Sequence, residues 1–87
     1  MLELQIICHG NVQGVGFRAA VKRMAEESKL TGFVRNLRNG SVEVVIQGEK
    51  EGVDDLFQQI NDQFEIDEFT EKYKKISKPY SKFTILF

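Results

Sequence analysis

The residues with the clearest chemical potential lie in one short stretch, GNVQGVGFR, which runs from Gly10 to Arg18. Because glycine has no Cβ, Gly10, Gly14 and Gly16 allow backbone amides to face outward together just before an expected helix. Unpaired amides at a helix N-terminus bind anions, and an arginine can hold two phosphate oxygens at once. The stretch is therefore either a tight turn or a cradle for a small anion, and its spacing alone favours neither.

Three familiar nucleotide-binding patterns do not fit this stretch. A P-loop requires a Lys-Ser or Lys-Thr pair after its glycines, and none follows here. The dinucleotide fingerprint requires a third glycine where the chain has Ala19. The aromatic RNA-binding signature belongs on the third strand of its fold, and the expected third strand, SVEVVIQ, has no aromatic residue to stack on a base. The sequence therefore argues against these three kinds of site.

The hydrophobic pattern predicts the elements that must position this stretch. Alternation over Leu2–Cys8 indicates a strand with one buried face, and the period changes to that of a helix from Phe17. The remaining expected elements follow in order: a helix end near Lys29–Thr31, a hairpin over Gly32–Gly48 with Asn39-Gly40 in a type I′ turn, a helix over Val53–Phe64, a strand over about Phe69–Ile76, and a closing strand, KFTILF. Phe33 is expected to pack in the core.

This order predicts an α+β fold, a ferredoxin-like βαββαβ sandwich with a mixed or antiparallel sheet of four to five strands and two helices on one face. The third strand lies between the first and second, which run parallel, so their C-terminal ends share one edge of the sheet. The glycine stretch and Asn36 both lie at that edge. Arg18 and Asn36 could therefore meet over one small ligand, in a single domain that spans residues 1–87.

Composition and charge indicate which partners and which location to expect for the protein. The chain has 87 residues and a net charge of −1, which argues against a nucleic-acid partner held mainly by electrostatics. No apolar run is long enough to span a membrane, and no segment resembles a signal peptide. We therefore expect a cytoplasmic protein without a nucleic-acid or membrane partner, monomeric by default at this size. Cys8, the single cysteine, is expected to be a small buried residue.

Two segments together closely resemble the acylphosphatase family. Its first signature runs Gly-x-Val-Gln-Gly-Val-x-Phe-Arg, and Gly10–Arg18 matches it. Its second signature runs Gly-aromatic-Val-x-Asn, a turn glycine, a valine-rich strand and a further glycine, and Gly32–Gly48 matches it. The recognisable part covers residues 3 to 48, together with a closing strand like the family's Phe-x-Ile ending. Two signatures in the right order and spacing are far more specific than a glycine pattern alone.

The resemblance implies hydrolysis of a small-molecule acyl phosphate to a carboxylate and phosphate, without metal or other cofactor. Arg18 would bind the phosphoryl group and Asn36 would orient the attacking water. The loop residues that would bind substrate with Arg18 are Asn11, Val12, Gln13, Gly14, Val15, Gly16 and Phe17. Asn11 stands where the family often has a basic residue. The residues also leave open a second hypothesis, a ferredoxin-like module that binds an anion or a protein without turnover.

Overall fold

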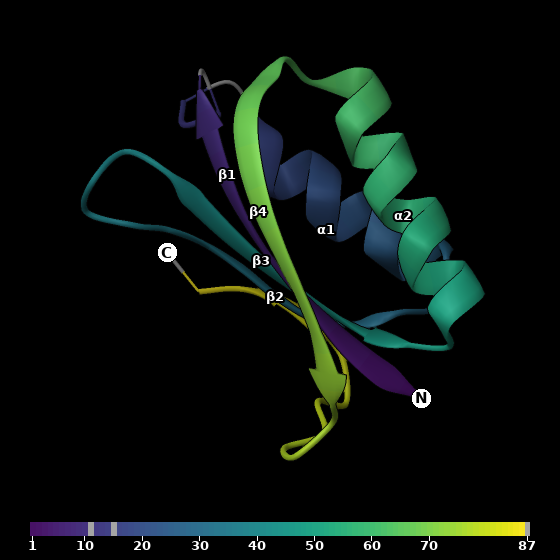
Figure 1. Cartoon of the computed structure of the whole chain (residues 1–87). Coiled ribbons are helices and arrows are strands. Elements are labelled where there is room, and N and C mark those ends of the chain that lie inside the picture. The colour runs from purple at the N-terminus through teal and green to yellow at the C-terminus, as the bar shows by residue number, and fades with distance from the viewer. Residues whose placement is uncertain (11, 15, 87) are drawn as a thin grey trace.

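Two helices lie side by side on one face of a single mixed sheet (Figure 1). The computed structural model describes residues 1–10, 12–14 and 16–86. Its elements are β1 (Leu2–Gly10), α1 (Phe17–Glu27), β2 (Thr31–Asn36), β3 (Val42–Gly48), α2 (Lys50–Gln63), β4 (Ile66–Lys75) and β5 (Phe83–Ile85). The predicted α+β sandwich, with both helices on one face, is confirmed, and the sheet has five strands.

The sheet places the ends of β1 and β2 at one edge. The strand order is β4-β1-β3-β2-β5, and β3 runs antiparallel to both β1 and β2. Val42 at the start of β3 pairs with Cys8 on one side and with Asn36 on the other. The C-terminal ends of β1 and β2 are thus separated by two strand spacings, about 10 Å. The shared edge predicted for the glycine stretch and Asn36 is confirmed.

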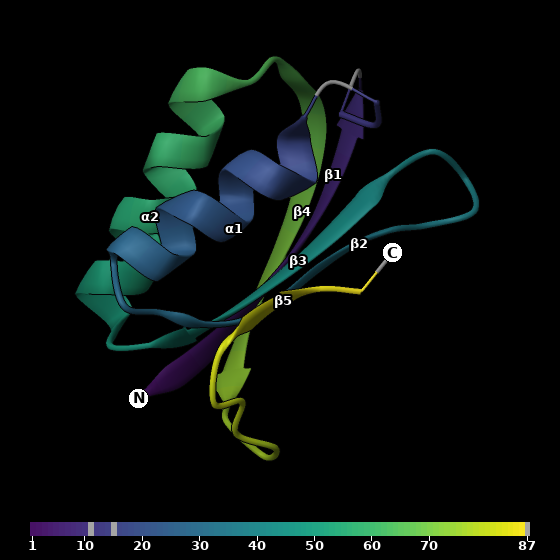
Figure 2. The same ribbon diagram turned by 180° about the vertical axis from the view of Figure 1, so that it is seen from behind.

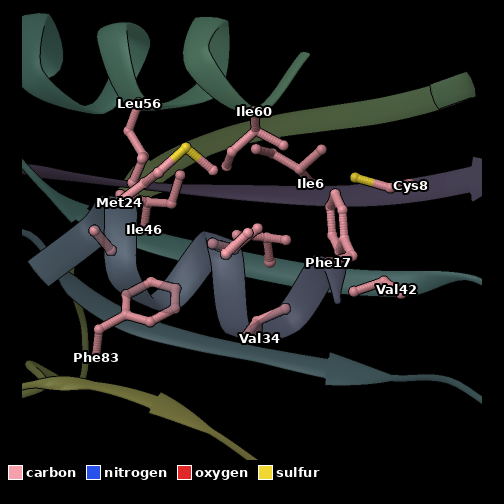
Figure 3. Close-up of a cluster of buried hydrophobic side chains, with 14 of the residues drawn as sticks. Ile6, Cys8, Phe17, Met24, Val34, Val42, Ile46, Leu56, Ile60 and Phe83 are labelled. Atoms are coloured by element: carbon pink, nitrogen blue, oxygen red, sulfur yellow. The ribbon is translucent and has the colours of Figure 1, made fainter. Parts of the chain in front are cut away.

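The core lies between the sheet and the two helices, and it anchors the start of α1 (Figure 3). Phe17, the first residue of α1, is only 1% exposed, and its ring meets that of Phe64 edge to face at 4.8 Å. Burial of such a ring contributes about 1.5–3 kcal/mol. The other large, fully buried side chains include Leu4, Ile6, Ile46, Leu56 and Ile60. Because Phe17 is fixed in this core, the first turn of α1 has a fixed position.

The turn between β2 and β3 differs from the prediction. Gly40 has φ 90°, but Asn39 does not have positive φ, so the type I′ turn at Asn39-Gly40 is wrong. The Leu37 amide donates to the Ser41 carbonyl at 2.8 Å, and the Gly40 amide donates to the Leu37 carbonyl at 3.2 Å. This pattern is a three-residue loop that ends in a left-handed glycine. Asn39 Oδ1 accepts the Ser41 amide at 3.0 Å, a local bond that favours the observed turn.

Two further differences concern the sheet. Phe33 does not lie in the core: it is on the face away from the helices, where its ring meets that of Tyr80 at 5.7 Å. β4 starts three residues earlier than predicted and is an outer strand of the sheet, next to β1. Its charged residues conceal any hydrophobic period, which explains the poor prediction. β5 runs parallel to β2 and is the other outer strand of the sheet.

Candidate active site

Gly14 and Gly16 have the backbone conformation expected of glycines in a tight turn. Gly14 and Gly16 both have φ 77°, in the left-handed region that favours glycine. A Cβ added at either position would meet no described atom within 4 Å. Glycine is therefore favoured at these two positions by the backbone angle and not by lack of space. Gly14 and Gly16 thus add no side chain where the chain turns into α1.

The N-terminus of α1 is open to a ligand. Gly16 occupies the N-cap position and supplies no side chain to the helix amides. The first helical bond runs from the Ala20 amide to the Gly16 carbonyl at 3.0 Å. The amides of Phe17, Arg18 and Ala19 precede it, so they lack acceptors within the helix. The first turn contains no acidic residue to offset the helix dipole, which leaves its positive end for an anion.

A pocket of about 190 Å³ lies at this helix end. Its lining residues are Val12, Gly14, Gly16, Phe17, Arg18, Ala19 and Ile85. The volume is several times the roughly 30 Å³ that one water occupies in the liquid, so a phosphoryl group fits. Among residues 1–10, 12–14 and 16–86, no carboxylate forms a salt bridge with Arg18. Within that part of the chain, the guanidinium charge is therefore available to a ligand.

Asn36 lies at the end of β2, with an unsatisfied oxygen. Val34, two residues earlier, is fully buried against the helices, and residues two apart on a strand share a face. The Asn36 side chain thus faces the helix side of the sheet. Its Oδ1 atom is buried and has no hydrogen-bond partner within the described part of the chain. A buried carbonyl oxygen without a partner is costly, so this atom is well suited to accept a hydrogen bond from bound water.

Arg18 and Asn36 line two separate hollows at the same end of the molecule. Asn36 lines a hollow of about 410 Å³ with Arg35, Leu37 and Arg38. Figure 2 shows the start of α1 and the β2–β3 hairpin at this common end. The structure therefore brings Arg18 together with the loop glycines and places Asn36 near the edge, but it does not join both side chains in one pocket.

The other predicted binding residues divide into three groups. Gly14, Gly16 and Phe17 line the pocket beside Arg18. Val12 also lines it, but its side chain is fully buried and its amide donates to the Gly10 carbonyl at 2.9 Å. The Gln13 side chain is bonded to the β2–β3 hairpin. Asn11 and Val15 lie outside the described residues. The binding roles of all seven residues stay predictions.

The electrostatics of the site depend on which arginines are paired. Arg35 Nε donates to Glu43 Oε1 at 2.6 Å, and Gln5 Nε2 donates to the other carboxylate oxygen of Glu43 at 2.6 Å. Glu43 is only 5% exposed, so this pair offsets most of the Arg35 charge near Asn36. Arg38 is exposed on the turn. Of the three arginines that line the two hollows, Arg18 and Arg38 are therefore the ones without a salt bridge among the described residues.

Cys8 is not a candidate nucleophile. Burial raises the pKa of its thiol to about 12, and its side chain is fully buried beside Ile6 in the core. The thiolate is the nucleophilic form of cysteine, and this pKa leaves the thiol protonated at neutral pH. The prediction that Cys8 is a small buried residue is confirmed.

The sequence did not indicate the part that β5 plays at the site. Ile85 lines the Arg18 pocket because β5 pairs in parallel with β2, and Ile85 lies beside Val34. The only signal was the Phe-x-Ile ending shared with the family. Within the described residues, no helix is long and apolar enough to cross a membrane.

The fold is a small α+β sandwich whose first helix begins, without a side-chain cap, at a pocket that Arg18 lines. The acylphosphatase family model matches residues 4–85, so the chain belongs to the acylphosphatase family. The resemblance stated from the two signatures is confirmed.

Similar proteins agree with this assignment. The chain is 48% identical over 56 residues to an acylphosphatase of Methylococcus capsulatus, over 64% of this chain and 61% of that protein. It is 51% identical over 58 residues to one of Chlorobaculum tepidum, over 67% and 63%. These matches thus span about three fifths of the curated relatives. The crystal structure of acylphosphatase from Bacillus subtilis is 29% identical, with a TM-score of 0.93 and full coverage of both chains.

Proposed function

We propose that this protein hydrolyses the carboxyl–phosphate bond of small acyl phosphates, giving a carboxylate and inorganic phosphate. The observation that carries the proposal is the uncapped start of α1, which faces a pocket that Arg18 lines. The names of the curated relatives and the match to the family support the same reaction. The protein would act as a single domain and a monomer. Both features, like the cytoplasmic location, stay predictions.

Substrate binding in this proposal depends on charge-assisted hydrogen bonds. The Arg18 guanidinium would donate to two phosphoryl oxygens, and the amides of Phe17 and Ala19 would donate to the same group. Each charge-assisted bond contributes about 1.5–3 kcal/mol. Phe17 is fixed in the core, so these donors are positioned before the substrate arrives. Preorganised donors of this kind stabilise charge that shifts during the reaction.

The chemical step requires a positioned water and little else. Asn36 Oδ1 would accept a hydrogen bond from the water. This bond would orient the water so that a lone pair of the water oxygen points at phosphorus. The oxygen–phosphorus bond to the carboxylate breaks as the new bond from water to phosphorus forms. The leaving carboxylate has a conjugate acid with a pKa near 4.3, so it departs without a proton. A phosphoryl oxygen can take the proton from water, and a protein base or a metal is then unnecessary.

The first test is hydrolysis of benzoyl phosphate in EDTA, with p-nitrophenyl phosphate as a control substrate. We expect wild-type turnover of benzoyl phosphate alone and a loss on the order of 10³-fold in kcat/KM for Arg18→Ala. Asn36→Ala should lower kcat more than it raises the Ki for phosphate. Arg23→Ala, on the exposed side of the same helix, is the matched control and should retain activity.

Two results would overturn the proposal. A folded wild-type protein that binds phosphate but leaves benzoyl phosphate intact would favour the anion-binding module. Near wild-type rates for both Arg18→Ala and Asn36→Ala would show that the site is elsewhere.

A further inference from the structure

The side chain of Gln13 connects the two halves of the candidate site. Its Nε2 donates to the Leu37 carbonyl at 3.1 Å and to the Ser41 carbonyl at 2.9 Å. Gln13 belongs to the loop before Arg18, whereas Leu37 directly follows Asn36. We propose that Gln13 is a positioning residue, which holds Asn36 in register with the anion site through these two bonds. The inference rests on the proposed function, because it concerns the same reaction.

On the hairpin side, Gln13 bonds to a turn that is already well defined. The Leu37 amide donates to the Ser41 carbonyl, the Gly40 amide donates to the Leu37 carbonyl, and Asn39 Oδ1 accepts the Ser41 amide. Both carbonyls that accept from Gln13 therefore have a second donor, so the turn keeps its own bonds without Gln13. Loss of the Gln13 side chain should free the hairpin from the loop without unfolding it.

On the loop side, Gln13 lies between a buried residue and a glycine at which the chain turns. Val12 is fully buried in the core, and Gly14 turns the chain with φ 77°. Val12, Gly14 and Gly16 line the Arg18 pocket, whereas the Gln13 amide is directed at the hairpin. The side chain of Gln13 is thus engaged with protein carbonyls instead of the pocket. Its contribution to the reaction would be the relative position of Asn36 and the phosphoryl group.

The chemistry of the two bonds requires a carboxamide of this length. A glutamine NH₂ group has two donors, and both are used here on two carbonyl acceptors. Glutamate has the same shape but no donor when ionised, and its charge would face the same two carbonyls. Asparagine keeps both donors but is one methylene shorter, so it cannot span the same gap. Gln13→Glu and Gln13→Asn therefore test the bonds, and Gln13→Ala tests the side chain.

The experiment combines steady-state kinetics on benzoyl phosphate with inhibition by inorganic phosphate. We expect Gln13→Ala to lower kcat about tenfold, since small misplacements of reacting groups are costly, and to change the phosphate Ki less than about twofold. Gln13→Ala should have no further effect on kcat in the Asn36→Ala background, because residues that act through one another are not additive. Gln58→Ala, which removes an exposed glutamine bond to Asp62 on α2, is the matched control.

Three results would overturn the proposal: a Ki that rises as much as kcat falls, which would make Gln13 a direct ligand; additive effects of Gln13→Ala and Asn36→Ala; or an unchanged kcat. If Gln13→Ala does not fold, Gln13→Asn should show the same kinetic pattern.

If the wild type lacks turnover, the proposed function fails separately. The side-chain amide signals of Asn36 in NMR then test the inference: phosphate should shift them in the wild type and much less in Gln13→Ala, and equal shifts would overturn it.

Discussion

The two helices of this protein begin in opposite ways. Both lack a side-chain cap, and in each the first helical bond ends at the N-cap carbonyl, at 3.0 Å. α1 starts from Gly16 in the left-handed region and has no acid in its first turn. α2 starts from Glu49 in an extended conformation and carries Glu51 in its first turn. The same backbone problem, unpaired amides at a positive helix end, therefore has two different solutions.

The difference shows which helix end is left for a ligand. Carboxylates near the start of α2 offset its dipole from within the chain, and they would repel a second anion. The start of α1 lacks such groups and has Arg18 beside a pocket. A helix N-terminus alone does not define an anion site. The candidate site depends on three features together: the absence of acids in the first turn, the left-handed glycines and the arginine. Three predictions follow from exchanging or removing these features.

The largest expected effect comes from placing an acid at the start of α1. Ala19 is exposed and lines the pocket, so Ala19→Glu would put a carboxylate beside the proposed phosphoryl site. Repulsion between like charges a few ångströms apart should raise the phosphate Ki at least tenfold, with kcat/KM falling in parallel. The thermal midpoint should stay equal or rise, because the new charge favours the helix dipole.

The matched change at α2 is Glu51→Gln, which should leave the kinetics unchanged and lower stability by about 0.3–1 kcal/mol. A phosphate Ki that is unaffected by Ala19→Glu would contradict the assignment of the anion site to α1.

An intermediate effect is expected from two glycines, with opposite signs. Gly16→Ala forces a Cβ into the left-handed region, so we expect a loss of about 1–2 kcal/mol. Gly52 lies within α2, and a Cβ there would be 3.6 Å from Leu30 Cδ2, an ordinary contact. Gly52→Ala should therefore stabilise by about 0.5–1 kcal/mol, since alanine is the better helix former. Urea unfolding of both variants measures the two changes in unfolding free energy. If both changes had the same sign, the contrast between the two glycines would be wrong.

Much of the fold could be predicted because its periods are local. The alternation of Leu4, Ile6 and Cys8 and the helical spacing after Phe17 are both consequences of burying one face. The shared edge of β1 and β2 followed from topology alone. The turn at Asn39 was mispredicted because a side-chain bond to Ser41 competes with the backbone preference of the Asn-Gly pair. β4 was placed poorly because an exposed edge strand has no buried face to set a pattern.

The candidate site could also be predicted in part from the sequence. Glycine spacing and Arg18 indicated an anion site, and the structure gives that stretch a pocket and an open helix end. The contribution of Ile85 and the Gln13 bonds depend on contacts between segments far apart in the sequence. No local pattern encodes such contacts. The separation of Arg18 and Asn36 into two hollows is likewise a result of strand register and side-chain packing.

The smallest expected effect concerns Asp54, near the start of α2. Hydrogen bonds from Lys50 and then from Tyr73 lower the pKa of this carboxyl. The bond to Asp54 in turn raises the pKa of Tyr73 to about 12. A carboxyl with a lowered folded-state pKa stabilises the fold above its unfolded pKa, about 3.9. This stability is lost as the pH falls through the folded-state pKa.

Asp54→Asn should therefore reduce stability at pH 7 by a few tenths of a kcal/mol, because the group is exposed and screened by solvent. The deficit should shrink as the wild-type carboxyl becomes protonated in acid. Asp55→Asn, next to it and without an ion pair among the described residues, is the matched control for the lost charge. Urea unfolding at several pH values compares the two variants. A deficit for Asp54→Asn that is constant with pH would show that the charge of Asp54 does not stabilise α2. The contrast between the starts of the two helices would then depend on Glu49 and Glu51 alone.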